Sequence, residues 1–224
     1  LAISPDEPRI KESISQVLAK WKGSDGGILL SPVATQSDLC VNGMFLNYAS
    51  YFKFPEEDLV SIVDQLLEEH LPDGGFNCRS NREKVKHSST HTTISVLEGI
   101  QEYQASGYTY QLDPLITAAE SAREFLLQHQ LFRSDRTGEI IDKKWLMLSY
   151  PSRWKYDILR ALCHFQTAGA PYDPRMDDAL EILLKKRCKD GAWPVQAKHA
   201  GQTHFDMEKT GSPSRWNTLR ALRV

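Results

Sequence analysis

The sequence lacks the features that would link it to a membrane or to a nucleic acid. No stretch is apolar over the length of a membrane span, and its start lacks the basic-then-apolar pattern of a signal peptide. The 27 Lys and Arg residues are balanced by 29 Asp and Glu residues, and beyond the local run Arg79, Arg82, Lys84, Lys86 they are dispersed. We therefore expect no transmembrane segment and no nucleic-acid partner.

Cysteine is also scarce. The four cysteines, Cys40, Cys78, Cys163 and Cys188, are widely spaced, which is typical of reduced thiols in a cytoplasmic protein. The spacing predicts a cytoplasmic location but leaves a disulfide open. A chain of 224 residues with 41% hydrophobic residues can bury one sizeable core, so we expect a single domain, 1–224.

What the sequence does contain is a repeated unit of helix, glycine turn and helix. In the clearest copy, apolar residues over 59–67 recur at the spacing of one helical face, and acidic residues occupy the other faces. The turn is Asp73 to Phe76, where adjacent glycines supply positive φ values. A second helix is expected to start at Ser88, Ser89 or Thr90, which are good N-cap residue types.

Three further copies follow the same plan. The first has its turn at 25–27 and a second helix over 38–52, and the third has helices over about 114–130 and from Pro151 to Phe165, joined by a long loop. The fourth has its turn at 190–193 and a last helix over 213–224. DGGF at Asp73 returns as DGAW at Asp190, and PSRW followed by LRAL occurs twice. Amphipathic helices would form an outer layer and nearly all-apolar ones a buried inner layer, in an array that runs open or closes into a ring.

An outer helix that ends in DGGF or DGAW and precedes a buried inner helix resembles the repeat of squalene cyclases and protein prenyltransferases. More narrowly, GGFNC, HSSTHTTISVLEGI and GSPSRWNTLRALRV look like a group of uncharacterised bacterial squalene-cyclase-like proteins. The resemblance covers essentially the whole chain and implies an all-α fold, the α/α toroid. That toroid has six hairpins and the sequence has four. The resemblance thus predicts an incomplete toroid that lacks one or two hairpins, at the N-terminal side, and whose ring is open or closes by association.

The resemblance implies three possible reactions, and the sequence lacks the motifs that two of them require. Cyclases that protonate an isoprenoid use a DxDD or DCTAE motif, and ionising terpene synthases use DDxxD to hold magnesium and diphosphate. None of the three occurs in the chain. The nearest strings, Asp177 with Asp178 and Glu56 to Asp58, lie on expected outer helices and face solvent.

The third chemistry, zinc-dependent prenyl transfer, has a partial match. The resemblance implies a zinc site from Asp38 and Cys40 at the head of the first inner helix and His91 at the head of the second. Zinc takes thiolate, imidazole and carboxylate ligands, and three protein ligands leave one position open. Cys78 could replace Asp38 or complete the set, with His87 in reserve. His91 is one residue out of the family register, and ordinary burial of cysteine and capping by histidine explain the same residues without a metal.

Other residues are candidates for a central cavity. Four of them, expected on the third and fourth inner helices, could contact substrate: Arg153, Trp154, Tyr156 and Trp216. Asp157 is a catalytic candidate that can pair with Arg153 on one helix face, and Glu208, in a loop expected to cover the cavity mouth, is a candidate proton carrier. The alternative is that the aromatic residues are core and that the charged pair is a structural bridge.

Two functions therefore remain open. The first is an enzyme that acts on an isoprenoid or other apolar substrate in a central cavity, with zinc at the inner-helix N-termini. The second is a non-catalytic helical repeat that binds a lipid or a protein, with a structural zinc or no metal. Fold alone does not separate them, because one fold serves many functions.

Overall fold

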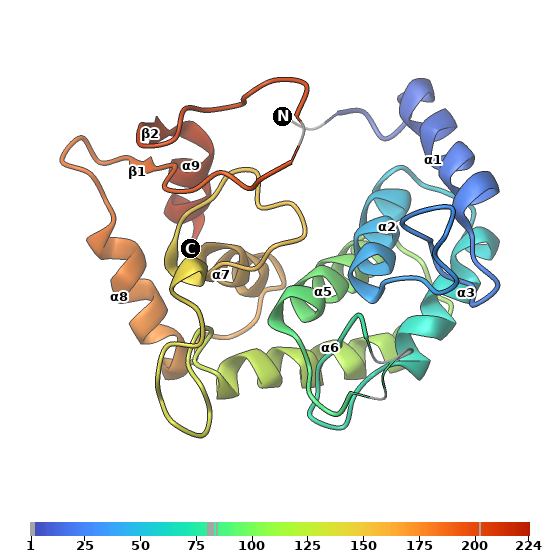
Figure 1. The fold of residues 1–224 in the computed structure, drawn as a ribbon, viewed down its shortest axis with the longest axis horizontal. Helices are drawn as coiled ribbons and strands as arrows, with labels where there is room; N and C mark the ends of the chain where they lie inside the picture. Colours follow the sequence, from blue (N-terminus) through green and yellow to red (C-terminus); the bar gives the residue numbers. More distant parts are fainter. Residues whose placement is uncertain (1–2, 80–82, 84, 202) are drawn as a thin grey trace. The chain divides into compact units, whose positions relative to one another are not determined.

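The computed structural model describes residues 3–79, 83, 85–201 and 203–224, and its regular structure is mostly α-helical, as predicted (Figure 1). The elements are, in chain order, α1 (Pro8–Trp21), α2 (Leu39–Tyr51), α3 (Glu56–Glu68), α5 (Thr90–Ala105), α6 (Leu112–Gln128), η1 (Lys143–Leu146), α7 (Ile158–Thr167), η2 (Pro174–Met176), α8 (Asp177–Lys185), β1 (Trp193–Pro194), β2 (Pro213–Ser214) and α9 (Arg215–Arg223). None of the helices in these described ranges has the length and apolarity that a membrane crossing needs.

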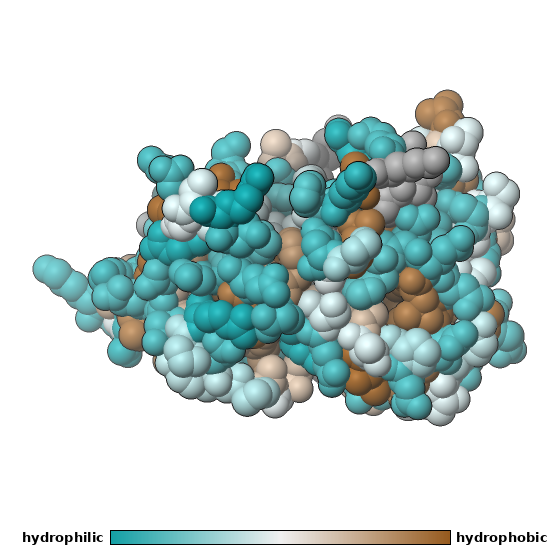
Figure 2. Space-filling view, turned by 90° about the horizontal axis from the view of Figure 1, so that it is seen from below, coloured by the Kyte–Doolittle hydropathy of each residue, from teal (hydrophilic) through white to brown (hydrophobic). Residues whose placement is uncertain are grey.

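The chain divides into two compact units, Leu1–Phe125 and Leu126–Val224. In the first, the buried helices α2 and α5 pack against each other, and α3 packs on α2. In the second, α7 packs against α9 and α8, and β1 pairs with β2 in an antiparallel ribbon. Hydrophilic residues cover most of the face in Figure 2, and the hydrophobic residues there form small separate patches.

The turns that precede α2, α5 and α9 share one backbone pattern. The amide of the residue two before the aspartate donates to the carbonyl of the residue two after it, at 2.8–3.0 Å: Gly23 to Gly27, Leu71 to Gly75 and Cys188 to Ala192. The glycine after each aspartate has a positive φ, between 83° and 98°, in Gly26, Gly74 and Gly191. A residue with a Cβ avoids this conformation, which explains the recurring Asp-Gly pair.

The second glycine of the DGGF turn has a different role from the one that the sequence suggested. Only the first of the two glycines, Gly74, has a positive φ. A Cβ on Gly75 would lie 2.7 Å from the Ser88 Cβ and from the Thr93 Oγ1. Gly75 is therefore required by the close approach of the inner helix and not by its own backbone angle.

A side-chain hydrogen bond joins each of these turns to its inner helix. The residue three positions after each turn aspartate donates its amide to the fourth residue of the helix: Ile28 to the Asn42 Oδ1 at 2.7 Å, Phe76 to the Thr93 Oγ1 at 3.0 Å, and Trp193 to the Thr218 Oγ1 at 2.9 Å. The donor is buried or partly buried in all three, so an unpaired amide there would cost about 1–3 kcal/mol. The same contact thus fixes three hairpins of different sequence.

Helix boundaries agree with prediction in the first unit and differ in the second. The helices expected over 38–52 and from Ser88, Ser89 or Thr90 are α2 and α5, and the one expected over 114–130 is α6. The helix expected from Pro151 begins at Ile158, since the Asp157 side chain caps it by accepting from the Arg160 amide at 2.8 Å. The last helix starts at Arg215, because Pro213 and Ser214 form β2.

The late start of α7 corrects several placements made from the sequence. Arg153, which has a φ of 52°, together with Trp154 and Tyr156, lies in the loop before α7 and not on an inner helix. Asp157 is the N-cap residue, so the pairing of Arg153 with Asp157 on one helix face does not form. Trp216 does lie on α9, as expected.

Candidate functional site

Two of the predicted zinc ligands meet in the first unit. Cys40 is the second residue of α2, and Cys78 follows the DGGF turn. The Cys40 amide donates to the Cys78 Sγ at 3.2 Å, and the Thr92 hydroxyl of α5 donates to the same sulfur at 3.2 Å. The packing of α2 on α5 therefore brings together two thiols that are remote in the sequence.

The pKa values of the two thiols are shifted in opposite directions. A hydrogen bond from the Cys40 thiol, with further help from Thr92 and the Cys40 amide, lowers the pKa of Cys78 to about 7 against the cost of burial. The same hydrogen bond raises the pKa of Cys40, and burial and the Asp38 carboxylate add to the shift. Both thiols are free and partly exposed.

The described residues do not assemble a full ligand set around this pair. Among them, no three His, Cys, Asp or Glu side chains are grouped so that they could hold a metal ion. Asp38 is the N-cap residue of α2, and His91 is the second residue of α5. Zinc therefore stays a prediction from the resemblance, and no chemical step is derived through it. Of the basic run near Cys78, Arg79 pairs with Glu83 at 3.4 Å, and Arg82 and Lys84 lie outside the described residues.

The second unit contains a pocket of about 380 Å³. It lies between the loop before α7 and the long segment that connects β1 to β2, and its lining residues are Tyr150, Pro151, Arg153, Val195, Lys198, His199, Thr203, His204, Phe205, Asp206, Met207, Glu208 and Thr210. The volume falls within the usual range for small-molecule sites. Arg153 and Glu208 are the two predicted site residues that line it.

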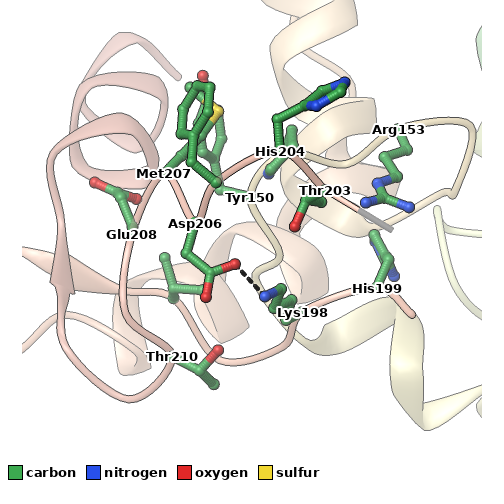
Figure 3. A pocket seen from close by; sticks show the side chains of 13 residues that line it. Tyr150, Arg153, Lys198, His199, Thr203, His204, Asp206, Met207, Glu208 and Thr210 are labelled. Atoms are coloured by element: carbon green, nitrogen blue, oxygen red, sulfur yellow. Dashed lines mark hydrogen bonds and ion pairs between the residues drawn. The ribbon is translucent and has the colours of Figure 1, made fainter. Parts of the chain in front are cut away.

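The pocket has walls of different chemistry. Arg153, His199 and His204 lie on one side, and Tyr150 and Met207 lie on the other (Figure 3). Lys198 and Asp206 form an ion pair between the two sides. Such a pocket offers cationic and imidazole donors to an anionic group and an apolar surface to a hydrocarbon chain.

Contacts behind the walls hold the lining residues in place. The Tyr150 ring stacks on Trp216 of α9, with centroids 5.5 Å apart and planes at 11°. The Arg153 guanidinium donates to the Ala200 carbonyl at 3.1 Å, which ties the loop before α7 to the β1–β2 segment. Glu208 accepts from the Arg215 amide at 2.8 Å and from the Ser214 hydroxyl, so both its oxygens bind the start of α9. Trp216 and Glu208 thus have a structural role at this pocket.

A hydrogen-bonded chain runs from the pocket wall into the core. The His199 Nε2 lies 3.0 Å from the Ser149 Oγ, which donates to the Asp157 Oδ2 at 3.1 Å. Asp157 is 2% exposed, and burial raises its pKa, although the Arg220 and Arg160 charges and the hydrogen bonds from Arg160 and Ser149 oppose that shift. Burial lowers the pKa of His199. Asp157 therefore supports the pocket through Ser149 without lining it.

The raised pKa of Asp157 predicts a pH dependence. A carboxyl whose pKa is higher in the folded than in the unfolded protein lowers stability as it ionises, so its effect grows as the pH rises from the unfolded pKa through the folded one. Asparagine keeps the capping oxygen and has no charge. We expect the free energy of unfolding of Asp157→Asn to increase relative to wild type between pH 4 and pH 8 in urea titrations. A relative decrease would show that the arginines outweigh burial.

The two remaining predicted substrate contacts lie elsewhere. Tyr156 is 3% exposed, and its hydroxyl donates to the Leu131 carbonyl at 2.5 Å within the core. Trp154 is 44% exposed, and Lys155 lies over its ring, but it does not line the pocket. Tyr156 is therefore a core residue, as the alternative interpretation of the aromatic residues held.

Sequence reasoning missed Tyr150, Lys198, His199, His204 and Met207 on the pocket wall. The available signal was the length of the segment between the DGAW turn and the last helix, which is rich in His and Lys. Glu208, which was expected in a loop over the cavity mouth, belongs to this segment, and the structure places it on the wall.

No family model matches the sequence, and a search of curated proteins finds no significant match.

Proposed function

We propose that this protein binds a small molecule with an anionic head and an apolar chain, of the isoprenoid class, in the pocket of its second unit. The observation that carries the proposal is the division of the pocket into a side with Arg153, His199 and His204 and a side with Tyr150 and Met207 (Figure 3). A ligand that is both charged and apolar would satisfy both sides at once.

We propose further that the hairpins belong to an α/α toroid of the squalene cyclase and prenyltransferase type, in which α2, α5, α7 and α9 are the inner helices. Support comes from the three turns with one hydrogen-bond pattern and from the contact of each turn with the fourth residue of its inner helix. Repeats that share such detail are expected to stack in a regular array. The toroid proposal and the ligand proposal agree, because the resemblance also implies an isoprenoid substrate.

We propose that the protein binds this ligand, and we propose no reaction. Of the two candidate acids, Asp157 does not line the pocket, and both oxygens of Glu208 accept hydrogen bonds from the start of α9. A proton donor to a ligand would need a free oxygen directed at it. The geometry therefore supports the non-catalytic alternative better than proton transfer by these two residues.

Calorimetric titration with three probes tests this function. Farnesyl diphosphate is expected to bind, with farnesol and inorganic pyrophosphate each at least about tenfold weaker, because each lacks one of the two groups. Arg153→Ala should weaken farnesyl diphosphate binding by about 10–100-fold, the effect of losing one charged hydrogen bond.

The matched control is Arg136→Ala, which removes the same charge from an exposed position of the second unit that does not line the pocket. It should bind farnesyl diphosphate as wild type does. Equal losses in the two variants would attribute binding to net charge alone, and no heat from farnesyl diphosphate at millimolar concentration would reject the proposed ligand class.

A further inference from the structure

We propose that Cys40 and Cys78 form a reversible thiol-modification site, at which Cys78 reacts with a low-molecular-weight disulfide of the glutathione class and Cys40 resolves the adduct. The site lies in the first unit and shares no residue with the pocket. It is therefore independent of the ligand proposed above.

The geometry supplies the pair that this chemistry needs. Both thiols are free and partly exposed, the Cys40 amide donates to the Cys78 Sγ at 3.2 Å, and the two cysteines are 38 residues apart in the sequence. Each lies on a fixed element: Cys40 is in the first turn of α2, and Cys78 is linked to α5, since its amide donates to the Thr92 Oγ1 at 3.2 Å. The Cys78 sulfur thus lies beside the backbone of Cys40, and a disulfide requires the two residues to be neighbours in this way.

The surroundings also assign the two roles. The Cys40 amide and the Thr92 hydroxyl both donate to the Cys78 Sγ, and donors of this kind stabilise negative charge on a sulfur. Cys78 is therefore the attacking thiolate. Cys40 supplies one of these two donors from the first turn of α2 and lies beside the Cys78 sulfur, so it is the thiol that attacks second.

The reaction balances as two exchanges. The Cys78 thiolate attacks one sulfur of glutathione disulfide, forms a mixed disulfide and releases one glutathione. Cys40 then loses its proton and attacks the Cys78 sulfur, which forms the Cys40–Cys78 bond and releases the second glutathione. Two protein thiols are oxidised and one glutathione disulfide is reduced.

The remaining cysteines provide internal controls. Cys163 and Cys188 lie in the second unit, where the Cys163 thiol donates to the Arg220 carbonyl at 3.9 Å. Neither is hydrogen-bonded to another cysteine among the contacts of the described residues. They should react slowly and yield mixed disulfides without resolution.

Peptide mapping tests the site in the whole protein. Reduced wild-type protein is incubated with glutathione disulfide, its free thiols are alkylated, and its peptides are identified by mass spectrometry. We expect a Cys40–Cys78 disulfide with Cys163 and Cys188 alkylated, and a thermal midpoint raised by about 5 °C or more, because the bond closes a long loop.

Single variants separate attack from resolution. Cys40→Ser should accumulate a glutathione adduct on Cys78, and Cys78→Ser should leave Cys40 at least tenfold slower to react than Cys78 in wild type. Cys188→Ser should form the disulfide at the wild-type rate. The proposal is overturned if wild-type protein leaves Cys40 and Cys78 free while Cys163 or Cys188 reacts, or if Cys40→Ser gathers no adduct on Cys78.

Discussion

Gly99→Val is expected to lower the free energy of unfolding by about 4 kcal/mol, and Gly99→Ala by about 2 kcal/mol. A Cβ on Gly99 would lie 2.4 Å from the carbonyl oxygen of Gly43, and a Cβ on Gly43 would lie 2.6 Å from the Ser95 carbonyl oxygen. Both clashes involve backbone atoms, so no side chain can rotate away. Either substitution forces α2 and α5 apart along the main contact of the first unit.

Helix propensity favours Gly99→Ala, in the opposite direction to the clash, so the sign of the measured change in stability shows which effect is larger. Alanine in a helix interior is favoured over glycine by about 1 kcal/mol, so a site with room for a methyl group would gain stability. A stabilised Gly99→Ala would therefore contradict the close crossing of α2 and α5. Urea unfolding followed by circular dichroism measures the change, and Gln104→Ala, at an exposed position of α5, should stay within about 0.5 kcal/mol of wild type. Replacing both Gly43 and Gly99 with alanine should cost less than the sum of the two single changes, because both added methyl groups strain the same helix crossing.

Tyr156→Ala is expected to lower the free energy of unfolding by about 3–5 kcal/mol. The ring is buried and packs edge-on against Trp145, with centroids 5.1 Å apart, and the hydroxyl donates to the Leu131 carbonyl. Tyr156→Phe keeps the ring and loses only the hydrogen bond, so it should cost about 1–2 kcal/mol. Calorimetric unfolding would measure both changes.

Comparing Tyr156→Ala with Trp154→Ala shows whether Tyr156 acts as a core residue or as a ligand contact. Trp154→Ala removes a larger aromatic ring from an exposed position of the same loop and should change stability by less than about 1 kcal/mol. If Tyr156→Ala kept full stability and lost only farnesyl diphosphate binding, Tyr156 would be a ligand residue as the sequence suggested.

The first unit could be predicted from the sequence because its signals are local. The apolar spacing over 59–67 and the Asp-Gly turns each act within a few residues, and they place α2, α3 and α5 correctly. The juxtaposition of Cys40 with Cys78 follows once the two inner helices are set side by side.

The second unit could not be predicted to the same extent. PSRW occurs twice, but after Pro151 it forms a loop, whereas after Pro213 it passes from β2 into α9. The difference depends on tertiary contacts: Asp157 reaches Ser149, and Arg153 reaches Ala200. No local pattern encodes these partners, so the helix was predicted too early and the pocket wall was only partly identified.

In the hydrogen bond from each turn to its inner helix, the position of the acceptor is fixed relative to the start of the helix and not relative to the turn. The donor and acceptor are 14 residues apart in the first of these hairpins, 17 in the second and 25 in the last, yet the acceptor is always the fourth helical residue. The connection can therefore gain residues while the hairpin keeps its geometry. In the last hairpin the added length supplies most of the lining of a pocket, which suggests how a repeat of this type can acquire a new binding surface at little cost to its folding.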